Sequence, residues 1–170
     1  FARSTHAANR LGFTSFVFPR NRIGKKHILE RHGVKIFRGE DSAWHQRIRS
    51  RQQHAGRIAN LVDKMLPIAP EAVHPIRDGQ MVNLPGSMLF MSKNGLRKFA
   101  AAGVTVTKLN RGIAAAINNG GVFHLWFHPS NFYHDRDAQF VLFENFVRHL
   151  AELSSRGAIG VKPMASFAAH

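Results

Sequence analysis

The sequence predicts an α/β fold with mainly parallel strands, and three observations support this. Short runs of β-branched and aromatic residues alternate with longer amphipathic runs. Glycine follows most of the longer runs, as it commonly does at helix C-termini. Hydrophobic residues make up 44% of the 170 residues, which is enough for a packed core, and composition does not shift along the chain. We therefore expect residues 1–170 to form a single domain or part of a larger one.

The first predicted elements each have a residue that ends them. Gly12 follows the first helical run and Gly33 the second, while Pro19 stops the first strand because proline has no amide to donate. A later run carries Ile, Leu, Val and Met at helical spacing among Arg and Gln. In order, we predict a helix over 1–12, a strand over 14–18, a helix over 25–32, a strand over 34–37 and a helix over 43–65.

Residues 66–87 are predicted to be a long connection without regular structure, because they contain four prolines and two glycines. Long loops in compact domains often carry function. We expect this connection to cross the outside of the fold and to bring Gly86 and Ser87 to the C-terminal ends of the strands.

The last part of the chain contains the strongest strand signal, VFHLWF at 122–127, and the clearest amphipathic helix, 137–156. The predicted apolar side of that helix comprises Phe140, Val141, Phe143, Val147, Leu150 and Leu153. The other predictions are a short strand over 88–91, helices over 92–102 and 105–118, a strand over 158–161 and a short helix over 163–169. Strands that alternate with helices are expected to run parallel, with the helices outside the sheet.

Net charge is the most unusual property of the composition. The chain has 24 Lys and Arg against 10 Asp and Glu, a formal charge of +14, which favours an anionic partner. The absence of Cys excludes disulfide frameworks and thiolate metal sites, and no apolar stretch is long enough for a membrane span. An arginine-rich run on the predicted helix over 43–65 fits either polyanion binding or a solvated helix face. Neither a nucleic-acid-binding motif nor a nucleotide-binding glycine loop is present, which argues against nucleic acid.

The segment HLWFHPSNF, residues 124–132, is the strongest candidate site. Alternation along a strand places His124, Trp126 and His128 on one face, opposite the apolar Phe and Leu residues. Pro129 ends the strand, so His128 lies at its C-terminal end, where active sites gather in α/β folds. A histidine there is either a hydrogen-bonded structural residue or a catalytic one, and the neighbouring Trp126 and Asn131 favour the catalytic interpretation.

A second candidate site follows the strand over 14–18. Arg20 and Asn21 could orient a carboxylate or bind a substrate oxygen. The alternative is an ordinary solvated turn.

Three segments resemble the polysaccharide deacetylase family, the NodB-homology deacetylases of carbohydrate esterase family four. They are GVFHLWFHPSNF (121–132), SFVFPRN (15–21) and LPGSMLF (84–90), and the resemblance covers roughly residues 13–165 of this chain. It matches the C-terminal half of the family's domain. The resemblance implies part of a distorted, incomplete (β/α) barrel with mainly parallel strands. It also implies a hydrolase that removes N- or O-linked acetyl groups from a polysaccharide or glycan with a divalent metal, commonly zinc.

By this resemblance, His128 is the general acid and Trp126 walls the acetyl pocket, while Arg20, Asn21 and Asn131 are candidate substrate-binding residues. Pro19 matches the family's Pro, but Val17 stands where the family has Arg, so Arg20 or Arg22 would have to supply the guanidinium group.

The family's T-F-D-D and H-x-x-x-H motifs are absent. We therefore expect the base and the metal ligands upstream of Phe1, in a missing N-terminal half of the same domain, and no activity from these residues alone. The other function left open is a non-catalytic basic module that binds an anionic polymer, either nucleic acid or an acidic polysaccharide.

Overall fold

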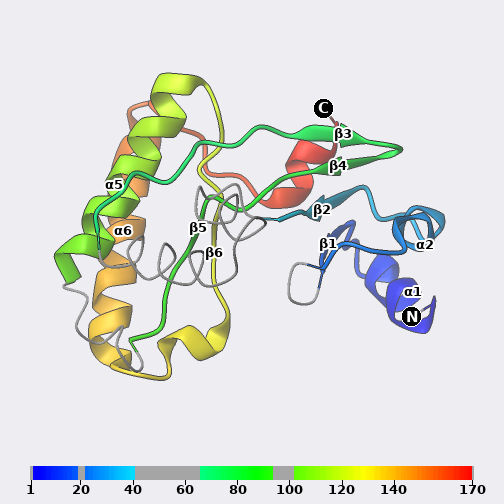
Figure 1. The fold of residues 1–170 in the computed structure, drawn as a ribbon, viewed down its shortest axis with the longest axis horizontal. Helices are drawn as coiled ribbons and strands as arrows, with labels where there is room; N and C mark the ends of the chain where they lie inside the picture. The colour runs from blue at the N-terminus through cyan, green and yellow to red at the C-terminus, as the bar shows by residue number, and fades with distance from the viewer. Residues whose placement is uncertain (1, 19–21, 41–65, 94–101, 170) are drawn as a thin grey trace, which may run out of the picture. The chain divides into compact units, whose positions relative to one another are not determined.

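A computed structural model describes residues 2–18, 22–40, 66–93 and 102–169 of the chain (Figure 1). These residues belong to two compact units. Unit 1 comprises Phe1–Glu40, His74–Gly86 and Lys162–His170, and unit 2 comprises Asp41–Val73 and Ser87–Val161. The predicted helix over 43–65 and most of that over 92–102 lie outside the described residues.

Unit 1 contains a four-stranded mixed sheet. Helix α2 (Lys26–Arg31) connects the first two strands, which therefore run parallel as predicted, with Ser15 opposite Ile36. The third strand across the sheet also runs parallel to the second, and only the third and fourth strands are antiparallel to each other. The strand order across the sheet is β1 (Ser15–Val17), β2 (Ile36–Arg38), β4 (Met81–Asn83) and β3 (Ile76–Asp78).

Strands β3 and β4 form a tight hairpin, so the prediction that residues 66–87 lack regular structure is wrong over 76–83. Asp78 pairs with Met81 across the two-residue turn, and Gly79 at its first position has φ +63°. Glycine at the first position is typical of one class of two-residue hairpin turns, because it adopts this left-handed conformation without strain. The prolines that suggested an irregular segment flank the hairpin at Pro75 and Pro85.

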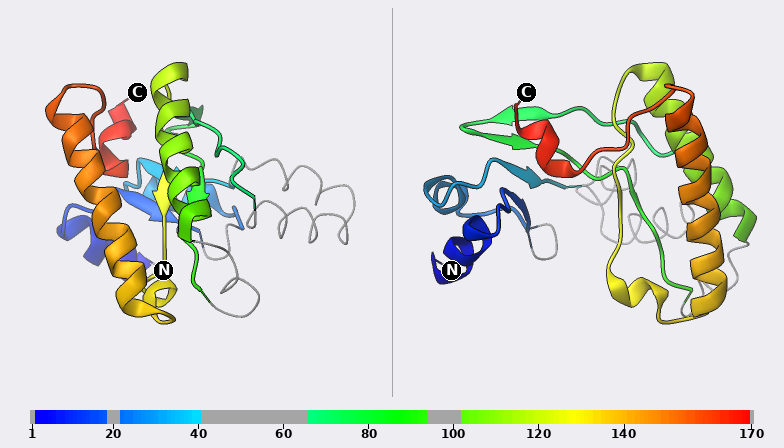
Figure 2. Two further views of the ribbon diagram at one scale, coloured as in Figure 1. Left: turned by 90° about the vertical axis from the view of Figure 1, so that its left-hand side faces the viewer. Right: turned by 180° about the vertical axis from the view of Figure 1, so that it is seen from behind.

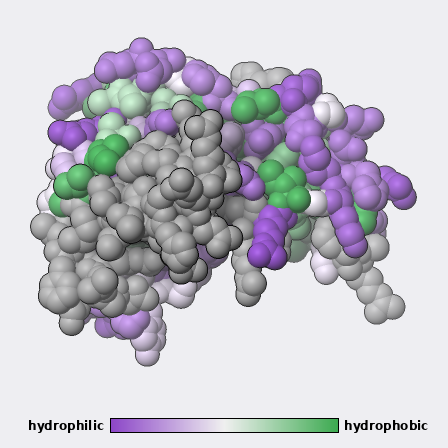
Figure 3. All heavy atoms as spheres, viewed as in Figure 1, coloured by the Kyte–Doolittle hydropathy of each residue, from purple (hydrophilic) through white to green (hydrophobic). Residues whose placement is uncertain are grey.

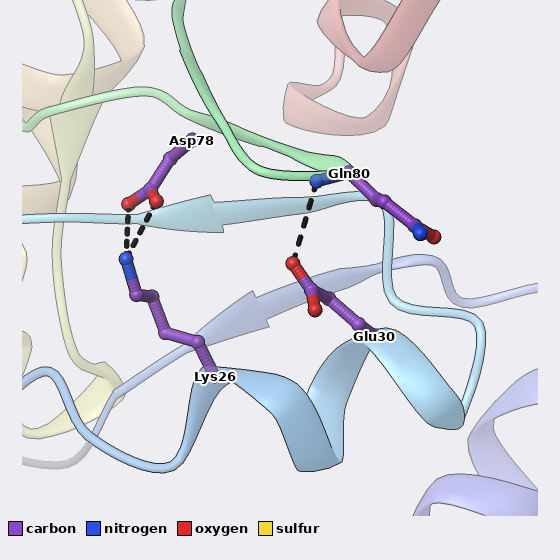
Figure 4. Close-up of polar contacts among 4 residues, drawn as sticks. All are labelled: Lys26, Glu30, Asp78 and Gln80. Atoms are coloured by element: carbon purple, nitrogen blue, oxygen red, sulfur yellow. Dashed lines mark hydrogen bonds and ion pairs between the residues drawn. The ribbon is translucent and has the colours of Figure 1, made fainter.

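The core of unit 1 lies between α2 and the sheet, around the buried residues Leu29, Phe37 and Met81. The rings of Phe18 and Phe37 meet edge to face at 5.5 Å. Polar contacts hold α2 against the hairpin (Figure 4): Lys26 Nζ donates to both carboxylate oxygens of Asp78 at 2.5 and 2.7 Å. The Gln80 N–H donates to Glu30 Oε1 at 3.3 Å.

The ends of the chain complete unit 1. Helix α1 (Ala2–Arg10) ends where predicted, with Gly12 at φ +75°. The short C-terminal helix is also present as predicted, as the 3₁₀-helix η4 (Met164–Ala169), which contacts β2 and β4.

Unit 2 contains a parallel pair of short strands, β5 (Met88–Leu89) and β6 (Leu125–Trp126). Helices α5 (Ala102–Asn119) and α6 (Arg136–Ser155) lie on the same side of this pair (Figure 2). Both helices were predicted within three residues of their observed bounds. The core between helices and strands comprises Met88, Phe90, Leu109, Ile113, Phe132, Leu142 and Phe146.

The predicted strand over 158–161 is absent from unit 2, because its first residue completes the end of α6. The Ala158 N–H donates to the Leu153 carbonyl at 3.0 Å, and the Gly157 N–H donates to the Ser154 carbonyl at 3.0 Å. This pair of bonds, with Gly157 at φ +71°, is a Schellman motif. Gly157 therefore closes the helix as predicted, and the residues after it form no strand.

The buried side of α6 differs from the predicted one. Gln139, Leu142 and Phe146 are buried. Three of the predicted apolar residues, Phe143, Leu150 and Leu153, do pack against the core, but Phe140, Val141 and Val147 are exposed. The prediction failed for these three because the large apolar residues of α6 cover more of its circumference than one core-facing stripe can bury.

The described residues thus form a mixed α/β structure with mostly parallel strands and no closed barrel. On the face that Figure 3 shows, the described residues are mainly hydrophilic, with hydrophobic residues in small separate groups. No helix among them is long and apolar enough to cross a bilayer.

Gly112 of α5 allows a close contact with the strand segment, and replacing it should destabilise unit 2. A Cβ at this position would lie 2.3 Å from Cε2 of Phe123, whose ring packs against the core. We expect Gly112→Ala to cost about 1–3 kcal/mol by overpacking, which outweighs the roughly 1 kcal/mol gained in helix propensity.

A matched control lies on the same helix. At Gly103 no heavy atom lies within 4 Å of an added Cβ, so Gly103→Ala should leave stability unchanged or raise it. Urea unfolding of both variants measures the difference. Equal stabilities would show that Phe123 does not need the space that Gly112 leaves.

Candidate functional site

The candidate site lies where β6 ends. Backbone hydrogen bonds hold the strand to β5: the Phe90 N–H donates to the Trp126 carbonyl at 2.9 Å, and the Ser87 N–H donates to the His124 carbonyl at 2.9 Å. His128 then remains extended, at φ −102° and ψ 149°, because a residue that precedes proline is disfavoured in helical conformations. Pro129 begins the 3₁₀-helix η3 (Pro129–Phe132) at the position where proline is best tolerated.

Asn131 fixes the backbone of His128 by two reciprocal hydrogen bonds. The His128 N–H donates to Asn131 Oδ1 at 2.6 Å, and the Asn131 N–H donates to the His128 carbonyl at 2.8 Å. Asn131 itself is buried, with 8% of its surface exposed. The structure therefore gives it a positioning role, and direct contact between its side chain and a substrate remains a prediction.

Gln139 connects the same turn to the segment that follows β5. Among the described residues of unit 2 it is the most buried polar one, and its Nε2 donates to the Met91 carbonyl at 2.7 Å and to the Asn131 carbonyl at 3.4 Å. The sequence analysis missed this residue. Its spacing could have revealed it: Gln139 lies three positions before Leu142, and residues at this spacing share one side of a helix, here the side of α6 that faces the core.

The imidazole of His128 is exposed, although its backbone is fixed. Its ring meets the half-buried indole of Trp126 edge to face, with centroids 5.6 Å apart and planes at 86°. The two side chains thus lie on one face of the strand, as its alternation predicted. An accessible imidazole on a fixed backbone, beside an apolar wall, can transfer a proton to a bound ligand.

The opposite face of the strand is apolar, as predicted. Phe123 and Leu125 pack against the core of unit 2. Phe127 is partly exposed, and its ring meets the rings of Phe132 at 5.4 Å and Phe143 at 5.3 Å. These ring contacts hold the end of the strand on the face opposite His128 and Trp126.

Ser87 is brought to the strand by a pairing over a long sequence distance. It is buried, and its Oγ accepts the His124 N–H at 3.1 Å and donates to the Val122 carbonyl at 3.4 Å. The resemblance at 84–90 had drawn attention to this serine. The structure places it just before β5 and beside His124, which precedes β6, so it lies at the N-terminal ends of these parallel strands and the prediction that it reaches their C-terminal ends is wrong.

The second candidate site is not described. Arg20 and Asn21 lie outside the described residues, so their position relative to His128 remains a prediction. Val17, which stands where the deacetylase family has Arg, is an exposed residue of β1.

The described residues do not fit a metal ion, because no three of their His, Asp and Glu side chains come together in a way that could hold one. Comparisons of the chain with protein-family models, curated proteins and solved structures found no match. Any function proposed for this chain therefore depends on its own residues, chiefly on the arrangement around His128.

Loss of the Asn131 side chain should loosen the turn that carries His128. Asn131→Ala leaves the His128 N–H without its acceptor, which we expect to cost about 1–2 kcal/mol in the free energy of unfolding. Ser130→Ala, on the same turn but exposed, is the control and should change stability by less than about 0.5 kcal/mol. Urea unfolding compares the two, and an Asn131→Ala protein as stable as the control would contradict the positioning role.

Proposed function

We propose that this chain contributes the general acid of a hydrolase that removes acetyl groups from a polysaccharide or glycan. The observation that carries the proposal is the arrangement at the end of β6. The exposed imidazole of His128 lies beside Trp126, on a backbone held by Asn131. These residues belong to the segment 121–132 that resembles the late strand of polysaccharide deacetylases.

The chemistry assigned to His128 is a proton donation. When the acetyl group leaves its sugar, the bond between the carbonyl carbon and the sugar nitrogen or oxygen breaks, and that atom needs a proton. Histidine changes charge near neutral pH, so its protonated form can supply one. In this proposal the Trp126 indole borders the acetyl methyl group. The substrate-binding roles of Arg20 and Asn21, which lie outside the described residues, stay predictions.

A base and a divalent metal complete the proposed enzyme from outside these residues. The family resemblance implies both, and the described His, Asp and Glu side chains do not form a metal site. We place the base and the metal ligands, zinc ligands by resemblance, in a segment upstream of Phe1 that forms the other half of the same domain.

These 170 residues alone should therefore release no acetate from acetylated glycans. N-acetylglucosamine oligomers and acetylated xylan are suitable substrates, and the acetate formed can be measured by proton NMR. The same assay on a protein that also contains the preceding segment should detect release. Zinc-dependent release by the 170 residues alone would contradict our placement of the base and ligands, and no release by the longer protein would contradict the deacetylase proposal.

The alternative function, a non-catalytic basic module for an anionic polymer, is favoured by the net charge of +14. Such binding depends on released counterions and therefore weakens steeply with salt. Tight, salt-sensitive binding to dextran sulfate by a longer protein that releases no acetate would support this alternative.

A further inference from the structure

Helix α5 ends in an asparagine that a glycine follows. Asn119 is the last residue of the helix, and Gly120 comes next with φ +60°. Both residues are exposed. Asparagine is one of the thermolabile residues, and a glycine after it leaves the next backbone nitrogen unhindered, because glycine has no Cβ. The pair therefore has the groups for a reaction between the Asn119 side chain and the backbone.

That reaction is deamidation through a cyclic imide. The backbone nitrogen of Gly120 attacks Cγ of Asn119 and loses its proton to water. The bond from Cγ to the side-chain nitrogen breaks, and that nitrogen takes up a proton and leaves as ammonia. Water then opens the imide at either of its carbonyl carbons, which gives aspartate or isoaspartate. In sum, water is consumed and ammonia is released, so the reaction needs no other reagent.

The turn after α5 holds the attacking nitrogen weakly. The Gly120 N–H donates to the Ile117 carbonyl at 3.4 Å, and the Gly121 N–H donates to the Ala116 carbonyl at 3.0 Å, which together form a Schellman motif. At the matching position after α6, the Gly157 N–H donates at 3.0 Å. No heavy atom of the described residues lies within 4 Å of a Cβ added at Gly120, so the imide ring has room to form.

A second pair that can form the same imide is protected by its surroundings. Asp78 and Gly79 form the turn between β3 and β4, and Lys26 Nζ contacts both carboxylate oxygens of Asp78 at 2.5 and 2.7 Å (Figure 4). Turning the carboxyl carbon towards the Gly79 nitrogen would break both contacts. A Cβ added at Gly79 would lie 2.8 Å from Glu30 Oε1, so α2 also closely covers this turn. None of the described side chains holds Asn119 in this way.

We propose that Asn119 is a deamidation site of the folded protein, and that the Lys26 ion pair protects Asp78 from the same chemistry. Exposure, a weakly held glycine nitrogen and open space come together at Asn119. Asn110 is also exposed and lies on the same helix, but Arg111 follows it and its backbone lies well inside α5. Asn110 should therefore stay intact.

The product changes the end of α5 in two ways. A new carboxylate lies at the negative end of the helix dipole, and the last turn of α5 has no basic residue to offset it. Isoaspartate also adds a methylene to the backbone between Ala116 and Gly121, which are hydrogen-bonded to each other. The next residue, Val122, exchanges two backbone hydrogen bonds with Val73 at 2.8 and 2.9 Å, so the lengthened turn should strain this pairing.

The test is peptide mapping by mass spectrometry of the full chain, stored in warm, mildly alkaline buffer either folded or in guanidinium chloride. Trypsin places Asn119 and Asp78 on separate peptides, apart from the second Asn-Gly pair at Asn94, which lies outside the described residues. Folding should slow the conversion of Asn119 by less than about tenfold, because a helix end opens at little cost. It should slow isoaspartate formation at Asp78 by more than about tenfold, because the hairpin must first open.

Matched variants separate the two parts of the inference. Lys26→Met should remove most of the protection of Asp78, whereas Lys26→Arg keeps an ion pair and should keep the protection. The urea transition of each variant shows that it is folded. Asn119→Gln removes the reactive amide, so storage should lower the urea midpoint of the unchanged chain more than that of this variant.

An Asn119 that reacts in guanidinium chloride but stays intact in the folded chain would overturn the inference, and so would conversion of Asn110 at the same rate. Aspartate without isoaspartate at Asn119 would show direct hydrolysis in place of the imide. Equal isoaspartate formation at Asp78 in the folded and denatured chains would contradict the protection by Lys26.

Discussion

Replacing His128 by alanine is expected to lower turnover on an acetylated glycan by roughly 10²–10⁴-fold, the usual contribution of a general acid. The measurement requires a protein that contains this chain together with the segment that carries the base and the metal ligands. The side chain is exposed and its backbone is held by Asn131, so the substitution should not disturb the fold.

Two further measurements separate the roles that His128 could have. Metal content should be unchanged in His128→Ala, and a loss of metal would make the residue a ligand rather than an acid. His74→Ala is the matched control, since His74 is exposed and belongs to unit 1. Unchanged turnover in His128→Ala would remove the residue from the chemistry altogether.

The second large expected effect is a loss of stability, caused by a substitution in the aromatic core of unit 2. Phe90 follows β5 with 0% of its surface exposed, stacks on Phe132 at 5.3 Å and meets Phe143 edge to face at 5.6 Å. We expect Phe90→Ala to cost about 3–5 kcal/mol, from lost burial and from the cavity that remains. That is a large share of the roughly 5–15 kcal/mol that stabilises a typical domain.

Phe90 also supports the functional turn, because Phe132 closes η3. Phe90→Ala should therefore broaden the NMR signals of residues 128–132 as well as shift the urea midpoint. Phe13→Ala is the control for a change of the same size at an exposed position, and it should alter stability by less than about 0.5 kcal/mol. If Phe90→Ala unfolds at the same urea concentration as Phe13→Ala, the stacked rings do not form the core described here.

Part of the candidate site could be predicted from the sequence, because its signals are local. Strand alternation put Trp126 and His128 on one face, and their rings are indeed in contact. The extended backbone lasts to His128, just before Pro129, although the paired strand β6 ends two residues earlier than predicted, at Trp126. The roles of Asn131 and Gln139 could not be predicted in this way, since each depends on which backbone groups the fold leaves beside it.

By itself the sequence determined where most helices of the described residues lie and where they end. Gly12, Gly33 and Gly157 all have the positive φ of residues that follow a helix, a preference set by the absence of a Cβ. Such signals act over a few residues, so the neighbouring sequence is enough to predict them. The parallel pairing of β1 with β2 also followed, because a helix connects them.

Only the tertiary structure decided which distant segments meet. Ser87 bonds to His124 from 37 residues away, Gly112 receives the ring of Phe123, and α6 buries Gln139 while it exposes Val141. Each of these outcomes depends on the shape and hydrogen-bonding needs of a partner that is remote in sequence. A residue's own type and its neighbours do not contain that information, because burial and pairing are properties of the packed chain.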